Sequence, residues 1–214
     1  MLQYRSIYPK TLELLKELML QTCSQDFFLV GETALALQIG HRISIDIDMF
    51  TLCEFSSSKI LSELEKYFAV VNAAAGKNSL SFDGAIQGGN NEIIKVDLIR
   101  YSYPLINPVQ TVDNIRLLSV EDIIPMKLSA VAGRGSKKDF YDIFYLLDVY
   151  GLEQMISLFE TKFPQTSKFH IVKSLAFFDD AESEPDPLTI ENTDWTVIKE
   201  RITAEVNVFA SKQG

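Results

Sequence analysis

The stretch from Phe27 to Phe50 constrains the fold of this chain more than any other part of the sequence. It begins with the apolar run Phe27–Val30, which predicts a short buried strand. Gly31 interrupts that run, and the residues after it, TALALQ, are good helix formers. From Ile43 to Phe50 apolar and polar side chains alternate, as they do along a half-buried strand. The order strand, glycine turn, helix and strand predicts an α/β layer.

Asp46 and Asp48 occupy alternate positions of the second predicted strand, so their side chains share one face. Alternate strand residues lie roughly 6.5–7 Å apart, and carboxylates so placed repel each other unless a cation neutralises them. Mg²⁺ prefers hard oxygen ligands, and phosphoryl transfer uses metals held in this way. A glycine turn before a helix can point backbone N–H groups at a phosphate. The alternative is a half-exposed strand that happens to carry two aspartates, because a short motif is weak alone.

Two further strands are predicted at Ser79–Gln87 and Glu92–Arg100, joined by the hairpin signal GGNN. A third, at Ala69–Ala75, would precede them. Asp97 lies in the last strand, on the face that also carries Lys95. Asp is disfavoured in strands, which makes Asp97 the natural third carboxylate of the site. The alternative is an ordinary exposed aspartate.

The chain beyond residue 118 is predicted to be largely helical. Ser119–Asp122 resembles a helix N-terminal capping box, with Asp in the place of Glu. The helix that follows contains Pro125, so we expect a kink or a restart there. A second helix over Lys137–Tyr150 should end at Gly151 and form a helical hairpin with the first. Further predicted helices are Thr11–Leu20, Lys59–Phe68, Leu152–Lys162, Ser167–Phe178 and Trp195–Ser211.

Composition excludes several classes of protein. The chain has 214 residues, 47% of them apolar and 23% charged, which is typical of a globular protein with one domain or two small ones. No apolar run reaches membrane-spanning length, and the N-terminus lacks a signal-peptide pattern. Cys23 and Cys53 are too few for a disulfide framework or a zinc site. These features together favour the cytoplasm.

The net charge of −9 argues against strong non-specific nucleic-acid binding, which depends on neutralising phosphates. An RNA substrate stays open, because basic residues cluster at Arg134, Lys137 and Lys138. Many of the acidic residues lie in the segment Asp179–Asp194, which contains no Lys or Arg. That segment is most simply a solvated loop, and it could also bind a basic partner.

These motifs, taken in order, resemble those of a known family. The similar segments are Gly31–Leu37, Gly40–Arg42, Ser44–Asp48, Asp122–Leu128, and Arg134 with Lys138–Ile143. They are similar to the signature of the AbiEii/AbiGii-type toxin nucleotidyltransferases, within the polymerase-β-like nucleotidyltransferase superfamily. The resemblance implies an α/β (α+β) fold: a mixed-sheet core over residues 1–118 and a helical region over 119–214 packed on it.

The resemblance also implies an activity, namely Mg²⁺-dependent transfer of a nucleotide from an NTP to an acceptor that could be RNA. It implies the toxin component of a type IV toxin–antitoxin or abortive-infection system, with a cognate antitoxin. The implied metal ligands are Asp46, Asp48 and Asp97, the last of which could instead activate the acceptor hydroxyl. The implied nucleotide-binding residues are Gly31, Glu32, Thr33, Arg42, Ser44 and Lys127.

Two residues of the helical region receive roles from the same resemblance. Lys127 would neutralise the triphosphate, and Asp139 matches an essential acid in the family pattern K/R-D-x-Y-D. The alternative for Lys127 is a lysine that extends from an amphipathic helix to solvent. Asp142 is most simply one half of a surface pair with Lys138, four residues before it.

One position departs from the family pattern, because Glu32 stands where the family usually has a second glycine. A carboxylate at a phosphate-binding turn repels a triphosphate unless it points away, toward Arg42, or binds the metal. The sequence therefore leaves a second hypothesis open. In it the chain is a catalytically inactive nucleotide-sensing or protein-interaction module on the same fold.

Overall fold

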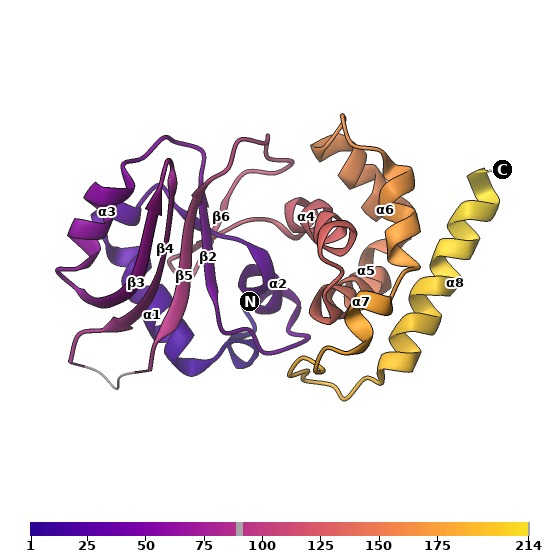
Figure 1. The fold of residues 1–214 in the computed structure, drawn as a ribbon, viewed down its shortest axis with the longest axis horizontal. Coiled ribbons are helices and arrows are strands. Elements are labelled where there is room, and N and C mark those ends of the chain that lie inside the picture. Colours follow the sequence, from indigo (N-terminus) through magenta and orange to yellow (C-terminus); the bar gives the residue numbers. More distant parts are fainter. Residues whose placement is uncertain (89–91, 214) are drawn as a thin grey trace. The chain divides into compact units, whose positions relative to one another are not determined.

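The computed structural model describes residues 1–88 and 92–213 of the chain. These residues form two compact units (Figure 1). The first unit comprises residues 1–102 and 109–118, and the second comprises residues 103–108 and 119–214. The chain therefore enters the second unit briefly, returns to the first, and leaves it again after Leu118.

A mixed seven-stranded sheet forms the first unit, in the spatial order β3-β4-β5-β2-β1-β7-β6. Its strands are β1 (Phe28–Leu29), β2 (Ile47–Thr51), β3 (Phe68–Gly76), β4 (Ser79–Ile86), β5 (Ile94–Arg100), β6 (Gln110–Val112) and β7 (Ile115–Leu117). Strand β2 is parallel to β5, and β1 is parallel to β7, whereas the other pairs are antiparallel. The helices of this unit are α1 (Pro9–Leu20), α2 (Gly31–Ile39) and α3 (Ser57–Leu64). The sheet confirms the predicted α/β fold.

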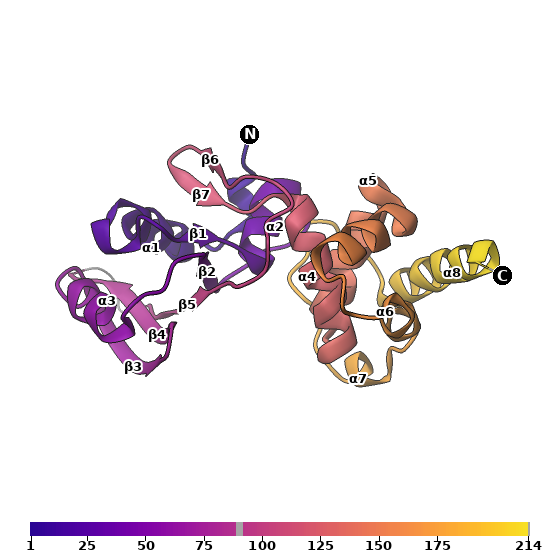
Figure 2. The same ribbon diagram turned by 90° about the horizontal axis from the view of Figure 1, so that it is seen from above.

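One face of strands β4 and β5 is apolar and buried. Along β4 and β5 the side chains of Leu80, Phe82, Val96 and Leu98 are buried, while their neighbours are half-buried or exposed. Helix α1 packs against β4 and β5, and α3 packs against β3 and β4. Figure 2 shows both helices on the same side of these strands. Each large apolar side chain buried there stabilises the fold by about 1.5–3 kcal/mol. The burial of these side chains determines which face of β4 and β5 is covered by helices, and the opposite face can carry polar groups.

The predicted strand around Asp46 and Asp48 differs in its start from the structure. The strand expected from Ile43 begins only at Ile47, because the backbone of Ser44 pairs instead with the segment before α1. The Ser44 N–H donates to the Ser6 carbonyl at 3.0 Å, and the Tyr8 N–H donates to the Ser44 carbonyl at 2.9 Å. The β4–β5 pairing is as predicted, while the expected turn at residues 88–91 lies mostly outside the described residues.

The second unit is helical within the residues described. Its helices are α4 (Val120–Gly133), α5 (Lys137–Lys162), α6 (Lys168–Leu175), α7 (Asp179–Glu182) and α8 (Trp195–Gln213). Gly151 has φ +65° and ψ 155°, so α5 is two helices that meet at the predicted position. The Ser119 hydroxyl accepts a hydrogen bond from the Asp122 N–H at 3.1 Å, which confirms the predicted cap. The restart offered as one possibility at Pro125 is wrong, since α4 continues through it as one helix.

A buried ion pair holds the second unit together. Lys162 Nζ lies 2.6 Å from Asp122 Oδ1, and both side chains are 0% exposed. The Asp122 carboxylate also accepts from the N–H groups of Ile106 and Asn107, and Lys162 donates to the Pro104 carbonyl. The pair therefore fixes residues 103–108 against the start of α4 and the end of α5.

Burial alone would raise the pKa of the Asp122 carboxyl. The hydrogen bonds that it accepts from Lys162, Ile106, Asn107 and Ser119 outweigh that effect, so the pKa is lowered. The carboxylate is accordingly charged in the folded protein. Within the part of the chain that the structure describes, no helix combines the length and the apolar character needed to cross a membrane.

Candidate active site

The turn at Gly31 brings a carboxylate against the start of a helix. The Val30 N–H donates to the Asp48 carbonyl at 2.9 Å, which holds β2 beside the residue where α2 begins. Gly31 has φ +66°, and a Cβ atom there would lie 2.8 Å from Asp48 Oδ2. Only glycine tolerates both the backbone angle and this approach. The first N–H groups of α2 have no partner within the helix and carry its positive dipole end, so they favour an anion nearby.

Asp48 and Asp97 are neighbours across the sheet. The parallel pairing of β2 with β5 places them directly opposite each other, and such partners point to the same face. Asp46 precedes β2 by one residue, and all three aspartates are half-buried. Among the residues described, no three His, Cys, Asp or Glu side chains are arranged so as to hold a metal ion. The predicted ligands are thus gathered on two adjacent strands without closing on a single point.

One ammonium lies among these carboxylates. Lys95 Nζ is 2.9 Å from Asp97 Oδ2, on the same face of β5. The hydrogen bond and the charge of Asp97 raise the pKa of Lys95, and the charges of Asp46 and Asp48 raise it further. All three predicted metal ligands therefore act on the same cation.

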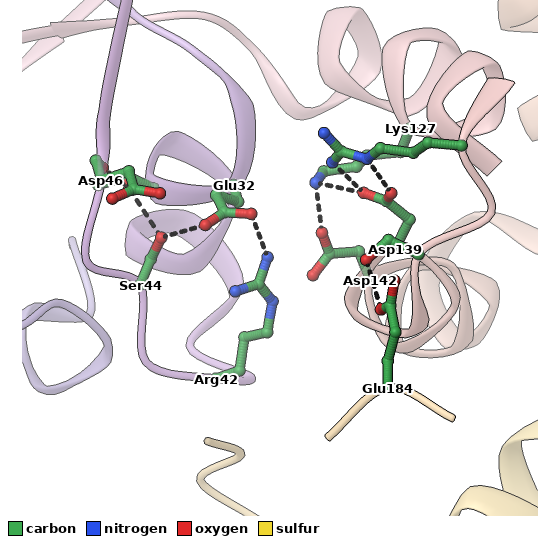
Figure 3. Close-up of polar contacts among 11 residues, drawn as sticks. Glu32, Arg42, Ser44, Asp46, Lys127, Asp139, Asp142 and Glu184 are labelled. Carbon is green, nitrogen blue, oxygen red and sulfur yellow. Dashed lines mark hydrogen bonds and ion pairs between the residues drawn. The ribbon is translucent and has the colours of Figure 1, made fainter. Parts of the chain in front are cut away.

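Glu32 does not extend from the turn toward solvent. Its Oε2 lies 3.2 Å from Arg42 Nη2, and its Oε1 accepts from the Ser44 hydroxyl at 3.4 Å (Figure 3). Glu32 and Arg42 are both buried. Of the orientations left open by the sequence, the one toward Arg42 is therefore correct. The positive charge of Arg42 offsets the repulsion that Glu32 would otherwise exert on a phosphate.

Hydroxyl groups fix the backbone that leads into β2. Thr33 Oγ1 lies 2.8 Å from Ser44 Oγ and donates to the carbonyl oxygen of Asp46. Thr11 Oγ1 donates to the carbonyl of the intervening residue, Ile45, at 2.5 Å. Thr33 and Ser44 are buried. These contacts set the position of the Asp46 backbone relative to the start of α2.

A second charged cluster lies between α4 and α5. Lys127 Nζ is 3.2 Å from Asp139 Oδ1 and 2.6 Å from Asp142 Oδ2 (Figure 3). Arg134 donates to both oxygens of Asp139, at 2.7 and 2.9 Å. The two aspartates are fully buried and Lys127 is nearly so. The alternative of a lysine extending to solvent is therefore wrong, and so is the interpretation of Asp142 as part of a surface pair.

Part of the acidic segment folds back onto its own unit. The Glu184 carboxylate accepts from the Ser136 hydroxyl at 2.7 Å and from the Lys137 N–H at 2.8 Å, at the start of α5. Asp186 pairs with Lys137 Nζ at 3.2 Å. This part of the segment is a helix cap and not only a solvated loop.

Comparison with known protein families identifies the family of this chain. A model of the nucleotidyl transferase AbiEii toxin of type IV toxin–antitoxin systems matches residues 13–211. The chain belongs to the AbiEii family. An uncharacterized protein of Aquifex aeolicus (strain VF5) is 39% identical over 167 residues, which are 74% of this AbiEii chain and 77% of that protein.

Two solved structures share the fold of this AbiEii protein. JHP933 from Helicobacter pylori has a TM-score of 0.59 at 16% identity, over 97% of this chain and 94% of that one. MenT4, a nucleotidyltransferase toxin from Mycobacterium tuberculosis H37Rv, has a TM-score of 0.56 at 13% identity, over 94% and 86%. The family and the fold predicted from the motifs are both confirmed.

The AbiEii structure groups the predicted site residues into three sets. Asp46, Asp48 and Asp97 gather near the Gly31 turn; Glu32, Thr33, Arg42 and Ser44 form a buried layer beside it; Lys127 and Asp139 belong together in the second unit. Sequence reasoning gave no role to Lys95, although its position two residues before Asp97 in a strand signalled the contact. Nothing in the sequence signalled that Glu184 caps α5.

Proposed function

We propose that this AbiEii protein is a metal-dependent nucleotidyltransferase that moves a nucleotide from an NTP to a hydroxyl of an RNA acceptor. In this proposal it acts as a cytoplasmic toxin controlled by a cognate antitoxin. The observation that carries the proposal is the position of Asp48, which lies against the first residue of α2 and directly across from Asp97. A phosphate at the helix start and a cation at the carboxylates would be neighbours there.

The donor set fits Mg²⁺. Three aspartate carboxylates are hard oxygen ligands, and they already attract a positive charge, the ammonium of Lys95. We assign Asp46, Asp48 and Asp97 as the residues that hold the metal. A bound divalent cation neutralises charge that develops on the phosphates. Asp97 has a second available role, since its carboxylate could accept the proton of the acceptor hydroxyl.

We assign phosphate contact at the turn to the backbone N–H groups of Gly31, Glu32 and Thr33. The side chains of Glu32, Thr33, Arg42 and Ser44 bond to one another and to the backbone of Asp46. In the proposal they are positioning residues, which hold the turn and the carboxylates in register.

The second unit contributes charge in this proposal. Lys127 supplies a positive group for the triphosphate, as a lysine does in the related motif. Asp139 positions Lys127 and Arg134 through the ion pairs described above.

The direct test is incubation of the full chain with each α-labelled NTP, Mg²⁺ and total RNA. The wild-type protein should label RNA with at least one NTP, and Asp46→Asn should abolish the labelling because a ligand charge is lost. Expression in a bacterial host should arrest growth, and co-expression of a neighbouring antitoxin gene should restore it. No transfer with any NTP, together with normal growth, would contradict the proposal.

The inactive-module hypothesis is motivated by Glu32 at the glycine turn and by the net charge of −9. The first of these arguments is weaker now, because Arg42 lies against Glu32 and offsets its charge. Calorimetry still separates the two hypotheses. Tight NTP binding without any transfer would favour a sensor, and absence of NTP binding would favour an interaction module.

A further inference from the structure

The ion pair between Lys95 and Asp97 stands at the proposed metal site and has no part in the proposed mechanism. Its two atoms are 2.9 Å apart, and the side chains are 54% and 21% exposed. A lysine ammonium is a compact cation on a flexible stem of four carbons. Because it is half exposed, it can leave Asp97 without disturbing the core.

The choice of partner by Lys95 is informative, because another carboxylate lies on the neighbouring strand β4. Asp83 of β4 is directly opposite Lys95 in the antiparallel pairing with β5. The Asp83 carboxylate accepts a hydrogen bond from Asn72 Nδ2 at 2.8 Å, on the β3 side. Lys95 pairs instead with Asp97, on the side where Asp48 adds its charge.

Lys95 and a divalent cation would compete for the same carboxylate. Lys95 Nζ already lies 2.9 Å from Asp97 Oδ2. A metal that used this oxygen as a ligand would take the place of the ammonium there.

We propose that Lys95 is a built-in counter-ion, which competes with the divalent cation for Asp97 and so lowers the metal affinity of the substrate-free protein. The inference rests on the proposed function, because it takes Asp97 as a metal ligand. In this view Lys95 is a positioning residue: it holds Asp97 away from the metal until the metal displaces it. Replacing the ammonium by an apolar group of similar length should therefore tighten metal binding.

The experiment is a titration of Mn²⁺ alone into the full chain, followed by electron paramagnetic resonance of the free ion. Lys95→Met should bind Mn²⁺ about three- to tenfold more tightly than the wild type. The matched control is Lys66→Met, because Lys66 is 56% exposed and pairs with Glu63 at 2.7 Å in the same unit. That variant should bind Mn²⁺ like the wild type. Circular dichroism would verify that each variant is folded.

A double-mutant cycle separates competition from a general effect of charge. In the D97N background, Lys95→Met should change the Mn²⁺ affinity by less than about twofold. Equal tightening in both backgrounds would overturn the inference, and so would an unchanged affinity of Lys95→Met beside a wild type that binds Mn²⁺. If D97N alone binds Mn²⁺ like the wild type, Asp97 is not a ligand and the proposed metal site fails first. Absence of Mn²⁺ binding by every form would overturn both.

Discussion

The two units of this protein use charged residues in opposite ways. In the second unit, Lys127 and Arg134 lie within ion-pair distance of the buried Asp139 and Asp142. In the first unit, the half-buried Asp97 pairs with the exposed Lys95, and the charges of Asp46 and Asp48 act on the same ammonium. Removing one partner from a buried cluster is costly, because a buried charge then loses its counter-charge. A half-exposed cluster of carboxylates can exchange its cation with solvent and is suited to receive a metal ion.

The largest expected effect is on stability, when a buried ion pair of the second unit is broken. Asp122→Ala should lower the free energy of unfolding by about 3–5 kcal/mol, because Lys162 is left charged and fully buried without its carboxylate. Urea denaturation of the full chain at neutral pH, followed by circular dichroism, measures this change. The control is Lys10→Met, which removes an exposed pair with Glu13 and should change stability by less than about 1 kcal/mol.

The pH dependence checks the cause of that loss. The pKa of Asp122 is lowered in the folded protein, so its contribution is fully present above the unfolded carboxyl value of about 3.9. The contribution is lost as the pH falls through the lowered value. The stability difference between the wild type and Asp122→Ala should therefore shrink below about pH 4. A difference that stays constant down to pH 2 would show that the carboxylate charge is not its source.

The second effect concerns Glu32, which belongs to the first unit but is buried and paired. Glu32→Gln should lower the free energy of unfolding by about 2–4 kcal/mol, because the buried Arg42 loses the negative charge that lies 3.2 Å from it. The same variant should bind NTP more weakly, since the Gly31 turn loses the contact between Glu32 and Arg42 that supports it. Thermal unfolding and calorimetric titration of NTP measure the two changes. Unchanged stability with tighter NTP binding would mean that Glu32 acts on the phosphate and not on Arg42.

The third effect is at Gly31. Gly31→Ala should cost about 1–2 kcal/mol for the positive φ alone, and the new Cβ would push the Asp48 carboxylate from its place. Metal affinity should fall with stability. Gly133→Ala is the matched control: it lies at the end of α4 with nothing within 4 Å of its added Cβ, so it should be tolerated. Equal behaviour of the two variants would disprove the close contact with Asp48.

The smallest change in stability is expected among the half-buried carboxylates of the first unit. Asp48→Asn should leave the free energy of unfolding unchanged or raise it by about 0.5 kcal/mol, because one repelling charge is removed. Nucleotide transfer should nevertheless fall by about 100-fold or more, which is within the range for an electrostatic catalytic group. Parallel denaturation and labelling assays measure the two quantities. A large loss of stability would show that Asp48 takes part in a stabilising ion pair, as the buried charges of the second unit do.

The fold around the candidate site could be predicted because its signals are local. The apolar run before Gly31, the helix after it and the alternation around Asp46 and Asp48 lie within 24 residues and obey simple periodicities. The hairpin of β6 and β7 was missed because its strands have three residues each, although Asp113 and Asn114 have the positive φ values of a tight turn.

Contacts between distant residues could not be predicted. Asp122 and Lys162 are 40 residues apart, and nothing in either neighbourhood indicates the other. Lys127 and Asp142 belong to different helices, and their pairing depends on how α4 and α5 pack. The partner of Glu32 was among the possibilities, but the sequence had no means to choose between Arg42, a metal and solvent. Periodicity determines which face a residue occupies, and only packing determines what that face meets.

The path of the chain has a consequence for anyone who wishes to take this protein apart. Residues 103–108 belong to the second unit, yet the first unit resumes at Val109 and continues to Leu118. Neither unit is therefore one contiguous piece of polypeptide. A fragment ending at residue 118 contains Ile106 and Asn107, whose N–H groups donate to Asp122, but not Asp122 itself. A fragment beginning at residue 119 contains Asp122 but not these two donors. Each unit is made of two separate pieces of the chain, so no single contiguous fragment contains all of either unit.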